Sequence, residues 1–312
     1  MAACACTVYM GTAAFAVPPL RALWEDGYPV VAVVTQPDRP AGRTQALRPS
    51  PVKEFALQHG LPLWQPARLR DAEALEHLRS LSPELIVVAA YGEILRPAVL
   101  ALPQYGCLNL HASLLPRHRG AAPIAAAILA GDRQTGVTLM QMDEGMDTGP
   151  VLAQEAVALS GRERQGELAG RLAKVAAGLL RRTLPAWLAG EVAPQPQDET
   201  QATTSRILHR EDGEIDWARP AQEIERMVRA YDPWPGAYTF LRGHRLHIRQ
   251  ARVLPGESLF SAGTILPESG RLIVATGEGL LILEEVQLEG KRPLPTDEFL
   301  RGQRELAGGK LG

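Results

Sequence analysis

LIVVAA, residues 85–90, is a continuous run of apolar residues that does not alternate with polar positions. A strand covered on both faces has this pattern, because neither of its faces meets water. Similar short runs occur at CTVYM (6–10), VVAVVT (30–35) and CLNL (107–110). Together these runs predict a sheet buried between two layers of helices.

Helical patterns separate the apolar runs. They lie at about 17–26, 51–59, 70–80 and 123–130. Strands that alternate with helices are typical of an α/β protein with a doubly wound, mostly parallel sheet of the Rossmann-like type. A longer amphipathic helix is predicted over 164–189, and Pro185 should bend it or end it.

The pattern changes after this long helix. EVAPQPQDETQATTSR is polar and has almost no bulky apolar residue, which predicts an extended linker over 190–206. Beyond it, short strand-like segments are separated by turns such as RGH and PESG. They predict a second, smaller antiparallel β-barrel, of which the oligonucleotide-binding (OB) type is one option. The predicted domains are therefore 1–189 and 207–312.

Composition sets limits on the class of protein. The chain has 312 residues and is 46% hydrophobic, which is enough for two packed domains. No apolar run approaches the roughly 20 residues that a membrane helix needs. The start MAACACTVYMG lacks the basic region of a signal peptide and is interpreted as the first strand. The three cysteines do not suggest a disulfide framework. We therefore expect a cytoplasmic protein with no membrane partner.

Because the net charge is −2, the protein does not bind nucleic acid through its overall charge. Binding of a polyanion would require local basic patches on the surface. One patch, over 39–53, includes Arg43. The other, over 242–252, has no acidic residue. Its arginines are Arg242, Arg245, Arg249 and Arg252. A solvated surface is the ordinary alternative explanation for both patches.

Three polar residues stand out in otherwise apolar strand and turn surroundings. Asn109 and His111 are two positions apart in one predicted strand, so their side chains would project side by side. Asp147 lies in the glycine-punctuated turn DEGMDTG, where Asp143 and Glu144 are alternatives. Each residue has a structural explanation of its own, such as a bond to a turn amide.

An amide, an imidazole and a carboxylate together fit a set of catalytic roles. The amide can donate to an oxyanion, the imidazole can move protons near neutral pH, and the carboxylate can orient the imidazole. Neither G-x-S-x-G nor H-E-x-x-H occurs. This favours direct attack of an external nucleophile on a carbonyl, without a metal. MGTAAF lacks the G-x-G-x-x-G fingerprint, which disfavours a nicotinamide enzyme.

These motifs resemble those of a known family. NLHASLLPRHRG (109–120), with AAYGEIL (89–95) upstream and GVTLMQMDEGMDTGPVL downstream, is similar to the 10-formyltetrahydrofolate-dependent formyltransferases. The resemblance implies a formyltransferase-type fold and a catalytic triplet of Asn109, His111 and Asp147. It implies 10-formyltetrahydrofolate as co-substrate and no metal. It assigns folate binding to Ser113, Leu114, Leu115 and Pro116.

Other stretches resemble the members of this family that formylate the α-amino group of initiator methionyl-tRNA. These stretches are MGTAAFAVPPL (10–20), TQPDRPAGR (35–43), PSPVKEFA (49–56), YDPWPGAYT (231–239) and DEFLRG (297–302). The resemblance implies that the amine attacks the formyl carbon directly through a tetrahedral intermediate. It also implies a role in translation initiation, and we expect the enzyme to act as a monomer.

The same resemblance implies where tRNA would bind. Arg43 would lie near the acceptor end. The second domain would hold the tRNA backbone through Arg242, Arg245, Arg249 and Arg252. The family commonly continues with basic residues after Pro-Ala-Gly-Arg, whereas this chain has Thr44, Gln45 and Ala46. The loop therefore offers fewer cations to phosphate.

Two alternatives stay open from the sequence. The triplet also serves formyltransferases whose acceptor is a small amine, and the chain could instead be an RNA-binding protein with a catalytically silent α/β domain. The polar triplet argues against the second alternative. A formyl-transfer assay with acceptors side by side discriminates among the three.

Overall fold

The computed structural model describes residues 5–41, 46–257, 259–268, 270–303 and 306–312. The chain forms two compact units, each built from several segments. The first unit comprises Met1–Pro123, Gln134–Ala158 and Leu168–Ser205, and the second comprises Ile124–Arg133, Leu159–Glu167 and Arg206–Gly312. Residues 190–205, most of the predicted linker, belong to the first unit.

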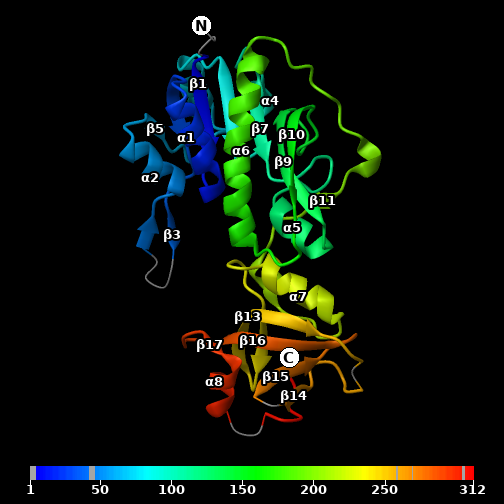
Figure 1. The fold of residues 1–312 in the computed structure, drawn as a ribbon. Coiled ribbons are helices and arrows are strands. Elements are labelled where there is room, and N and C mark those ends of the chain that lie inside the picture. The colour runs from blue at the N-terminus through cyan, green and yellow to red at the C-terminus, as the bar shows by residue number, and fades with distance from the viewer. Residues whose placement is uncertain (1–4, 42–45, 258, 269, 304–305) are drawn as a thin grey trace. The chain divides into compact units, whose positions relative to one another are not determined.

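A seven-stranded sheet forms the centre of the first unit (Figure 1). Its strands are β1 (Thr7–Gly11), β2 (Val30–Val34), β5 (Leu63–Trp64), β6 (Leu85–Ala89), β7 (Cys107–His111), β9 (Gln134–Gln141) and β10 (Val151–Ala158). Their order is β10-β9-β7-β6-β1-β2-β5. Only β9 breaks the parallel arrangement, because it pairs antiparallel with both β7 and β10. The predicted mostly parallel sheet is confirmed.

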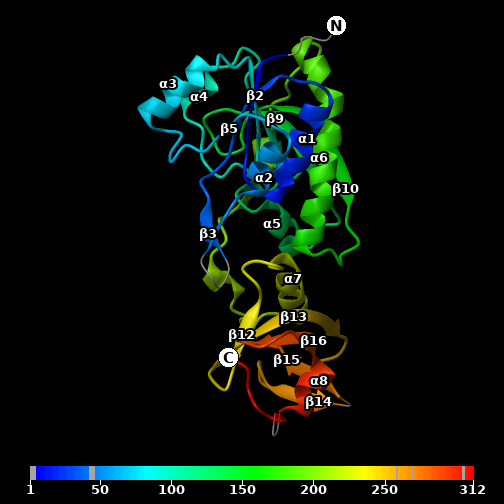
Figure 2. The same ribbon diagram turned by 90° about the vertical axis from the view of Figure 1, so that its left-hand side faces the viewer.

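Helices cover both faces of this sheet. The helices are α1 (Val17–Glu25), α2 (Pro51–Gln58), α3 (Ala72–Ser80), α4 (Pro97–Leu100) and α6 (Gln165–Leu188). Figure 2 shows α1 and α6 on one face and α3 and α4 on the other. The sheet is therefore doubly wound, and its strand order reverses between β1 and β6. In open α/β sheets, ligands bind beside the carboxyl ends of the strands at such a point.

The apolar runs form the central strands because both faces are covered. All residues of β1 and β6 are buried. Ser50 caps α2 by accepting a hydrogen bond of 3.0 Å from the Lys53 amide. Helix α6 continues past Pro185 to Leu188. Proline removes one backbone donor, but the buried Leu184 and Leu188 hold the last turn of the helix against the unit.

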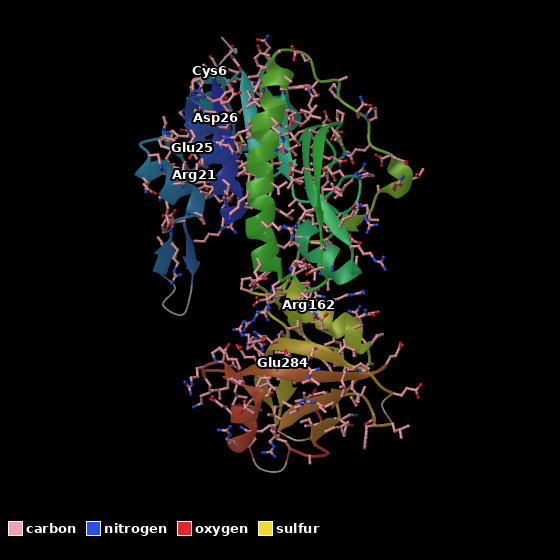
Figure 3. All side chains as sticks on the ribbon, viewed as in Figure 1. Cys6, Arg21, Glu25, Asp26, Arg162 and Glu284 are labelled. Atoms are coloured by element: carbon pink, nitrogen blue, oxygen red, sulfur yellow. The ribbon has the colours of Figure 1, made fainter. Side chains whose placement is uncertain are left out.

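Short elements complete the first unit. They are η1 (Ala14–Ala16), β3 (Arg39–Ala41), β4 (Ala46–Arg48), β8 (Arg119–Gly120), η2 (Glu199–Gln201) and β11 (Thr204–Ser205). β3 pairs antiparallel with β4, and β11 pairs parallel with β8. Arg181 of α6 donates to Glu25 and Asp26 at the end of α1, both labelled in Figure 3. These two ion pairs join the two helices on one face of the sheet.

The second unit contains a curled antiparallel sheet. Its elements are α5 (Pro123–Ala130), which begins at the last residue of the first unit, η3 (Arg210–Gly213), α7 (Ala221–Ala230), β12 (Tyr238–Leu241), β13 (His244–Leu254), β14 (Ile265–Glu268), β15 (Arg271–Ala275), β16 (Leu280–Leu288), β17 (Leu294–Pro295) and α8 (Thr296–Arg301). The strand order is β12-β13-β16-β15-β14, and β17 pairs with β16. The predicted barrel is confirmed as a half-barrel. Within the described residues, no helix is both long and apolar enough to cross a bilayer.

Candidate active site

The candidate active site lies at the carboxyl end of β7. Asn109 and His111 occupy alternate positions of this strand, so their side chains leave the same face. His111 is buried, with 6% of its side chain exposed, whereas Asn109 is half-buried. The neighbouring strands fix the register, since Asn109 pairs with Val88 of β6 and His111 pairs with Thr138 of β9.

Asp147 approaches both side chains from the turn between β9 and β10. Its Oδ1 accepts a hydrogen bond of 3.3 Å from Asn109 Nδ2. Its Oδ2 accepts one of 2.8 Å from the Gly120 amide and lies 3.6 Å from His111 Nδ1. The last distance suits an ion pair but exceeds a hydrogen bond. The three predicted residues therefore meet, although 38 positions separate Asn109 from Asp147.

The backbone at Asp147 has a φ of 55°, in the left-handed region. Aspartate tolerates this region better than most residues do, and positions of this kind cluster at functional sites. Asp143 and Glu144, the alternatives in the same turn, are exposed. Asp143 Oδ1 accepts from the Gly145 amide at 3.0 Å and from Thr148 Oγ1 at 2.7 Å. Asp143 thus stabilises the turn, and Asp147 alone of the three carboxylates joins the pair on β7.

The two ring nitrogens of His111 face different partners. Nε2 lies 3.0 Å from the carbonyl oxygen of His118. A carbonyl oxygen can only accept, so Nε2 carries a proton. Nδ1 faces the Asp147 carboxylate. Nδ1 is therefore the nitrogen available to take up and release a proton beside Asn109.

The predicted folate segment follows β7 directly. Ser113 is fully buried, and its Oγ donates to the Arg117 carbonyl at 2.6 Å. Leu115 is buried as well, and its amide donates to Thr138 Oγ1 at 3.0 Å. Leu114 and Pro116 keep part of their surface exposed. Two of the four side chains thus face inward, and the other two face partly outward.

The predicted tRNA-binding residues fall in two places. Arg43 lies outside the described residues. Arg242 sits in the turn between β12 and β13 with a φ of 52°. Arg245 and Arg249 are partly exposed residues of β13, next to the buried Leu246 and Ile248 of the same strand.

The four arginines of this patch differ in their contacts. The Arg245 guanidinium lies 4.2 Å from the centre of the Tyr238 ring. Arg249 Nε donates to Gln287 Oε1 at 3.0 Å. Arg252 forms an ion pair of 2.7 Å with Glu284, which Figure 3 labels. An arginine that already has a carboxylate partner is less available to phosphate.

Sequence patterns missed three residues around Asp147. They are Gly120, Arg119 and Gln197. Gly120 acts through its backbone amide, which carries no signal in the side-chain pattern. Arg119 is 6% exposed, although charged residues are seldom buried unless they are paired. Gln197 lies in the polar stretch that predicts a linker, so composition concealed its contacts with the site.

Within the described residues, no group of three or more histidine, cysteine or acidic side chains is placed to hold a metal ion. The polar groups of the site bond to each other and to backbone atoms. The chemistry that these residues themselves can supply is proton transfer and stabilisation of a negative charge.

Gly149→Ala is expected to destabilise the fold by about 1–3 kcal/mol, the usual cost of overpacking. A Cβ at this position would lie 1.9 Å from the carbonyl oxygen of Gln141. Thermal unfolding measures the change. Gly170→Ala is the matched control, because Gly170 is an exposed helical residue with no atom near the added methyl group. That change should stabilise by up to about 1 kcal/mol. Equal melting temperatures for the two variants would contradict the steric argument.

Comparisons with known proteins show the family to which the chain belongs. A family model described as Formyl transferase matches residues 7–184, and one described as Formyl transferase, C-terminal domain, matches residues 207–304. The chain is 52% identical to a methionyl-tRNA formyltransferase from Roseiflexus castenholzii, over 98% of each chain. It is 51% identical to one from Chloroflexus aggregans, over 95% of this chain and 96% of that one.

Solved structures share the fold at low sequence identity. One is a methionyl-tRNA formyltransferase from Clostridium thermocellum, with a TM-score of 0.56 and 16% identity over 90% of this chain and 97% of that chain. Another is HypX from Aquifex aeolicus in complex with tetrahydrofolic acid, with a TM-score of 0.62 and 16% identity over 96% of this chain and 47% of that chain. Because the two family models match residues 7–184 and 207–304 and the two methionyl-tRNA formyltransferases are 51–52% identical, the chain belongs to the formyl transferase family and is one of its methionyl-tRNA formyltransferases.

Proposed function

We propose that Asn109, His111 and Asp147 form the centre at which this enzyme transfers a formyl group. The donor is 10-formyltetrahydrofolate, and the acceptor is the α-amino group of methionine on initiator methionyl-tRNA. The enzyme works in the cytoplasm, where this tRNA enters translation. One observation carries the proposal: a carboxylate lies within 3.3 Å of the amide and 3.6 Å of the imidazole at the end of one strand.

The acceptor amine needs little activation. A free α-amino group has a pKa of about 7.7–8.0, so a sizeable fraction is neutral at cellular pH. The enzyme has to hold this neutral amine against the formyl carbon. Orientation of two bound reactants is itself a large source of rate enhancement. A covalent intermediate on the enzyme is unnecessary, and Ser113, two positions after His111, donates its hydroxyl hydrogen to the Arg117 carbonyl rather than to a base.

Asn109 would stabilise the tetrahedral intermediate. When the amine attacks, negative charge develops on the formyl oxygen. The Asn109 amide nitrogen has two hydrogens, one of which is directed to Asp147 Oδ1. The second hydrogen is free to point toward the developing oxyanion. Asp147 would therefore orient the donor as well as the imidazole.

His111 would move the proton. The attacking nitrogen must lose a proton, and the departing folate nitrogen must gain one. Nδ1 faces the carboxylate, while Nε2 is fixed by the His118 carbonyl. Nδ1 would accept the proton, and Asp147 would stabilise the resulting imidazolium. The proton then passes from Nδ1 to the folate nitrogen as the C–N bond breaks.

The folate would lie beside the strand ends of the first unit. The loops after β1 and β6 are tied together there, since Thr12 Oγ1 donates to the Tyr91 carbonyl at 2.8 Å. This place is the switch point of the sheet, one strand away from β7. Ser113, Leu114, Leu115 and Pro116 follow β7 and would line the same region.

A formyl-transfer assay tests the function directly. Radiolabelled 10-formyltetrahydrofolate is mixed with the protein and one acceptor: charged initiator tRNA, charged elongator tRNA or an amino sugar nucleotide. We expect label on the methionine of initiator tRNA and little on the others. Efficient labelling of the amino sugar alone would favour the small-amine alternative. No labelling of any acceptor would favour a silent RNA-binding protein.

The basic patch over 242–252 would hold the tRNA backbone. Phosphate contacts release counterions, so the affinity should fall as salt rises. Arg43 would contact the acceptor end, and Arg242, Arg245, Arg249 and Arg252 would lie along the backbone. A tRNA affinity that does not change with salt would contradict binding through these phosphate contacts.

Arg245→Gln should weaken tRNA binding more than Arg252→Gln. The Arg245 guanidinium rests on the Tyr238 ring, whereas Arg252 is already paired with Glu284. We expect the first change to reduce the slope of log affinity against log salt by about 1, the value for one lost phosphate contact. The second should change it by less than about half of that. Filter binding across a salt series measures both slopes, and a larger effect for Arg252→Gln would contradict this assignment.

A further inference from the structure

One residue outside the catalytic triplet bonds directly to the backbone of the Asp147 turn. Gln197 Nε2 donates to the carbonyl oxygen of Asp147 at 2.9 Å and to that of Gly149 at 2.7 Å. These two carbonyls flank Thr148, near the carboxyl-terminal end of the turn. A single amide group thus spans the segment that carries the carboxylate.

The other end of the same amide is also held. Gln197 Oε1 accepts from Arg119 Nε at 3.0 Å and from Arg119 Nη2 at 2.8 Å. Arg119 in turn forms an ion pair of 2.7 Å with Glu199. Arg119 has 8% of its side chain exposed, whereas Glu199 has 69% exposed. The hydrogen bond from Arg119 lowers the pKa of Glu199, so the pair stays charged at neutral pH.

Arg119 also belongs to the segment that contacts the catalytic side chains. Its neighbours are His118, whose carbonyl faces His111 Nε2, and Gly120, whose amide donates to Asp147 Oδ2. Thr203 holds this segment with one side-chain and one backbone acceptor: its Oγ1 accepts from the His118 amide at 2.8 Å, and its carbonyl accepts from the Arg119 amide at 2.9 Å. The chain from 197 to 205 therefore fixes both loops that meet at Asp147.

We propose that Gln197 is a positioning residue for catalysis, which sets the place of the Asp147 carboxylate by holding the backbone of its turn against Arg119. This inference rests on the proposed catalytic role of Asp147. Gln197 is not expected to touch folate or tRNA. Gln197 would act by keeping Asp147 close to Asn109 and His111. The distances to these residues are already long, at 3.3 Å and 3.6 Å, so a small displacement of the turn would separate the groups.

The test is a double-mutant cycle on the full-length protein with initiator methionyl-tRNA. Gln197→Met keeps the length of the side chain and removes both hydrogen-bonding groups. We expect kcat to fall about 10- to 100-fold, since misplacement of a catalytic group by about 1 Å can cost about 100-fold. KM for both substrates should stay within about twofold of the wild-type value. In an Asp147→Asn background, Gln197→Met should cause no further loss, because it acts through that carboxylate.

Two further variants complete the experiment. Gln201→Met is the matched control. Gln201 lies in the same segment, is exposed and, among the described contacts, bonds only to Asp198. The kcat of this variant should match that of the wild type. Gln197→Glu keeps an acceptor for Arg119 but cannot donate to the two carbonyls. It should lose as much kcat as Gln197→Met, and it decides the question if the methionine variant does not fold.

Several outcomes would overturn the inference. They are a wild-type kcat for both Gln197 variants, and an equal fold-loss of kcat in the wild-type and Asp147→Asn backgrounds. A further contradiction would be a loss confined to KM. Failure of the proposed function has a different signature, since Asp147→Asn would then keep wild-type turnover whatever Gln197 does.

Discussion

Asp147→Asn is expected to lower kcat for formyl transfer about 10²- to 10⁴-fold while the dissociation constant of the folate changes by no more than about threefold. The change keeps the shape of the side chain and removes its charge. Asn at this position could still contact Asn109, but it would no longer stabilise a proton on His111 Nδ1, which lies 3.6 Å from the carboxylate. The ground-state contacts of the folate do not require that charge.

Single-turnover kinetics and a folate titration separate the two effects. Glu144→Gln is the matched control, because it makes the same chemical change on an exposed side chain three positions away. We expect this control to behave as wild type in both measurements. If Asp147→Asn weakened folate binding as much as it slowed turnover, the carboxylate would be a binding group and the proposed proton path would be wrong.

Asn109→Ala is expected to raise the barrier of the chemical step by about 2.7–4 kcal/mol, which corresponds to a loss of about 10²- to 10³-fold in kcat. This is the usual cost of removing one donor from an oxyanion site. The Asn109 amide donates to Asp147 Oδ1 at 3.3 Å, so the group is already aimed into the site before substrate arrives. No reorganisation would then be needed as charge develops on the formyl oxygen.

Alanine also leaves a space, so a second substitution separates packing from donation. Asn109→Leu keeps most of the volume and removes the donor. Equal losses of kcat for the two variants would assign the effect to the hydrogen bond. A kcat for Asn109→Leu close to wild type would show that the amide does not stabilise the intermediate. Substrate titrations should give nearly unchanged affinities for both variants, because the oxyanion exists only after attack.

Much of the architecture follows from local patterns in the sequence. The runs at 85–90 and 30–35 became β6 and β2, since apolar residues with no alternation are stable as strands only when both faces are covered. The alternation of Asn109 with His111 placed their side chains together, because the period of a strand is two residues. Pro185 does not end helix α6, which continues to Leu188. Packing of the last turn outweighs the loss of the one backbone N–H donor that proline lacks.

The surroundings of the triplet could not be predicted in the same way. The contact of Asp147 with the Gly120 amide depends on how two loops meet, and a backbone amide is present at almost every residue. The bonds of Gln197 to Asp147 and Gly149 join parts of the chain about 50 positions apart. The polar composition around Gln197 indicated a segment exposed to solvent, whereas in the fold the Gln197 amide forms hydrogen bonds with the carbonyl oxygens of Asp147 and Gly149.

The pairing of β11 with β8 bears on how the two halves of the chain can be studied apart. The polar composition of residues 190–205 suggests a linker, and on that ground a truncated fragment would end with α6. Such a fragment would lack Thr204 and Ser205, which pair with Arg119 and Gly120. An isolated N-terminal fragment should therefore extend through Ser205 if Arg119 and Gly120 are to keep their native arrangement. Cleavage by a protease within residues 190–205 should for the same reason lower the activity of the enzyme.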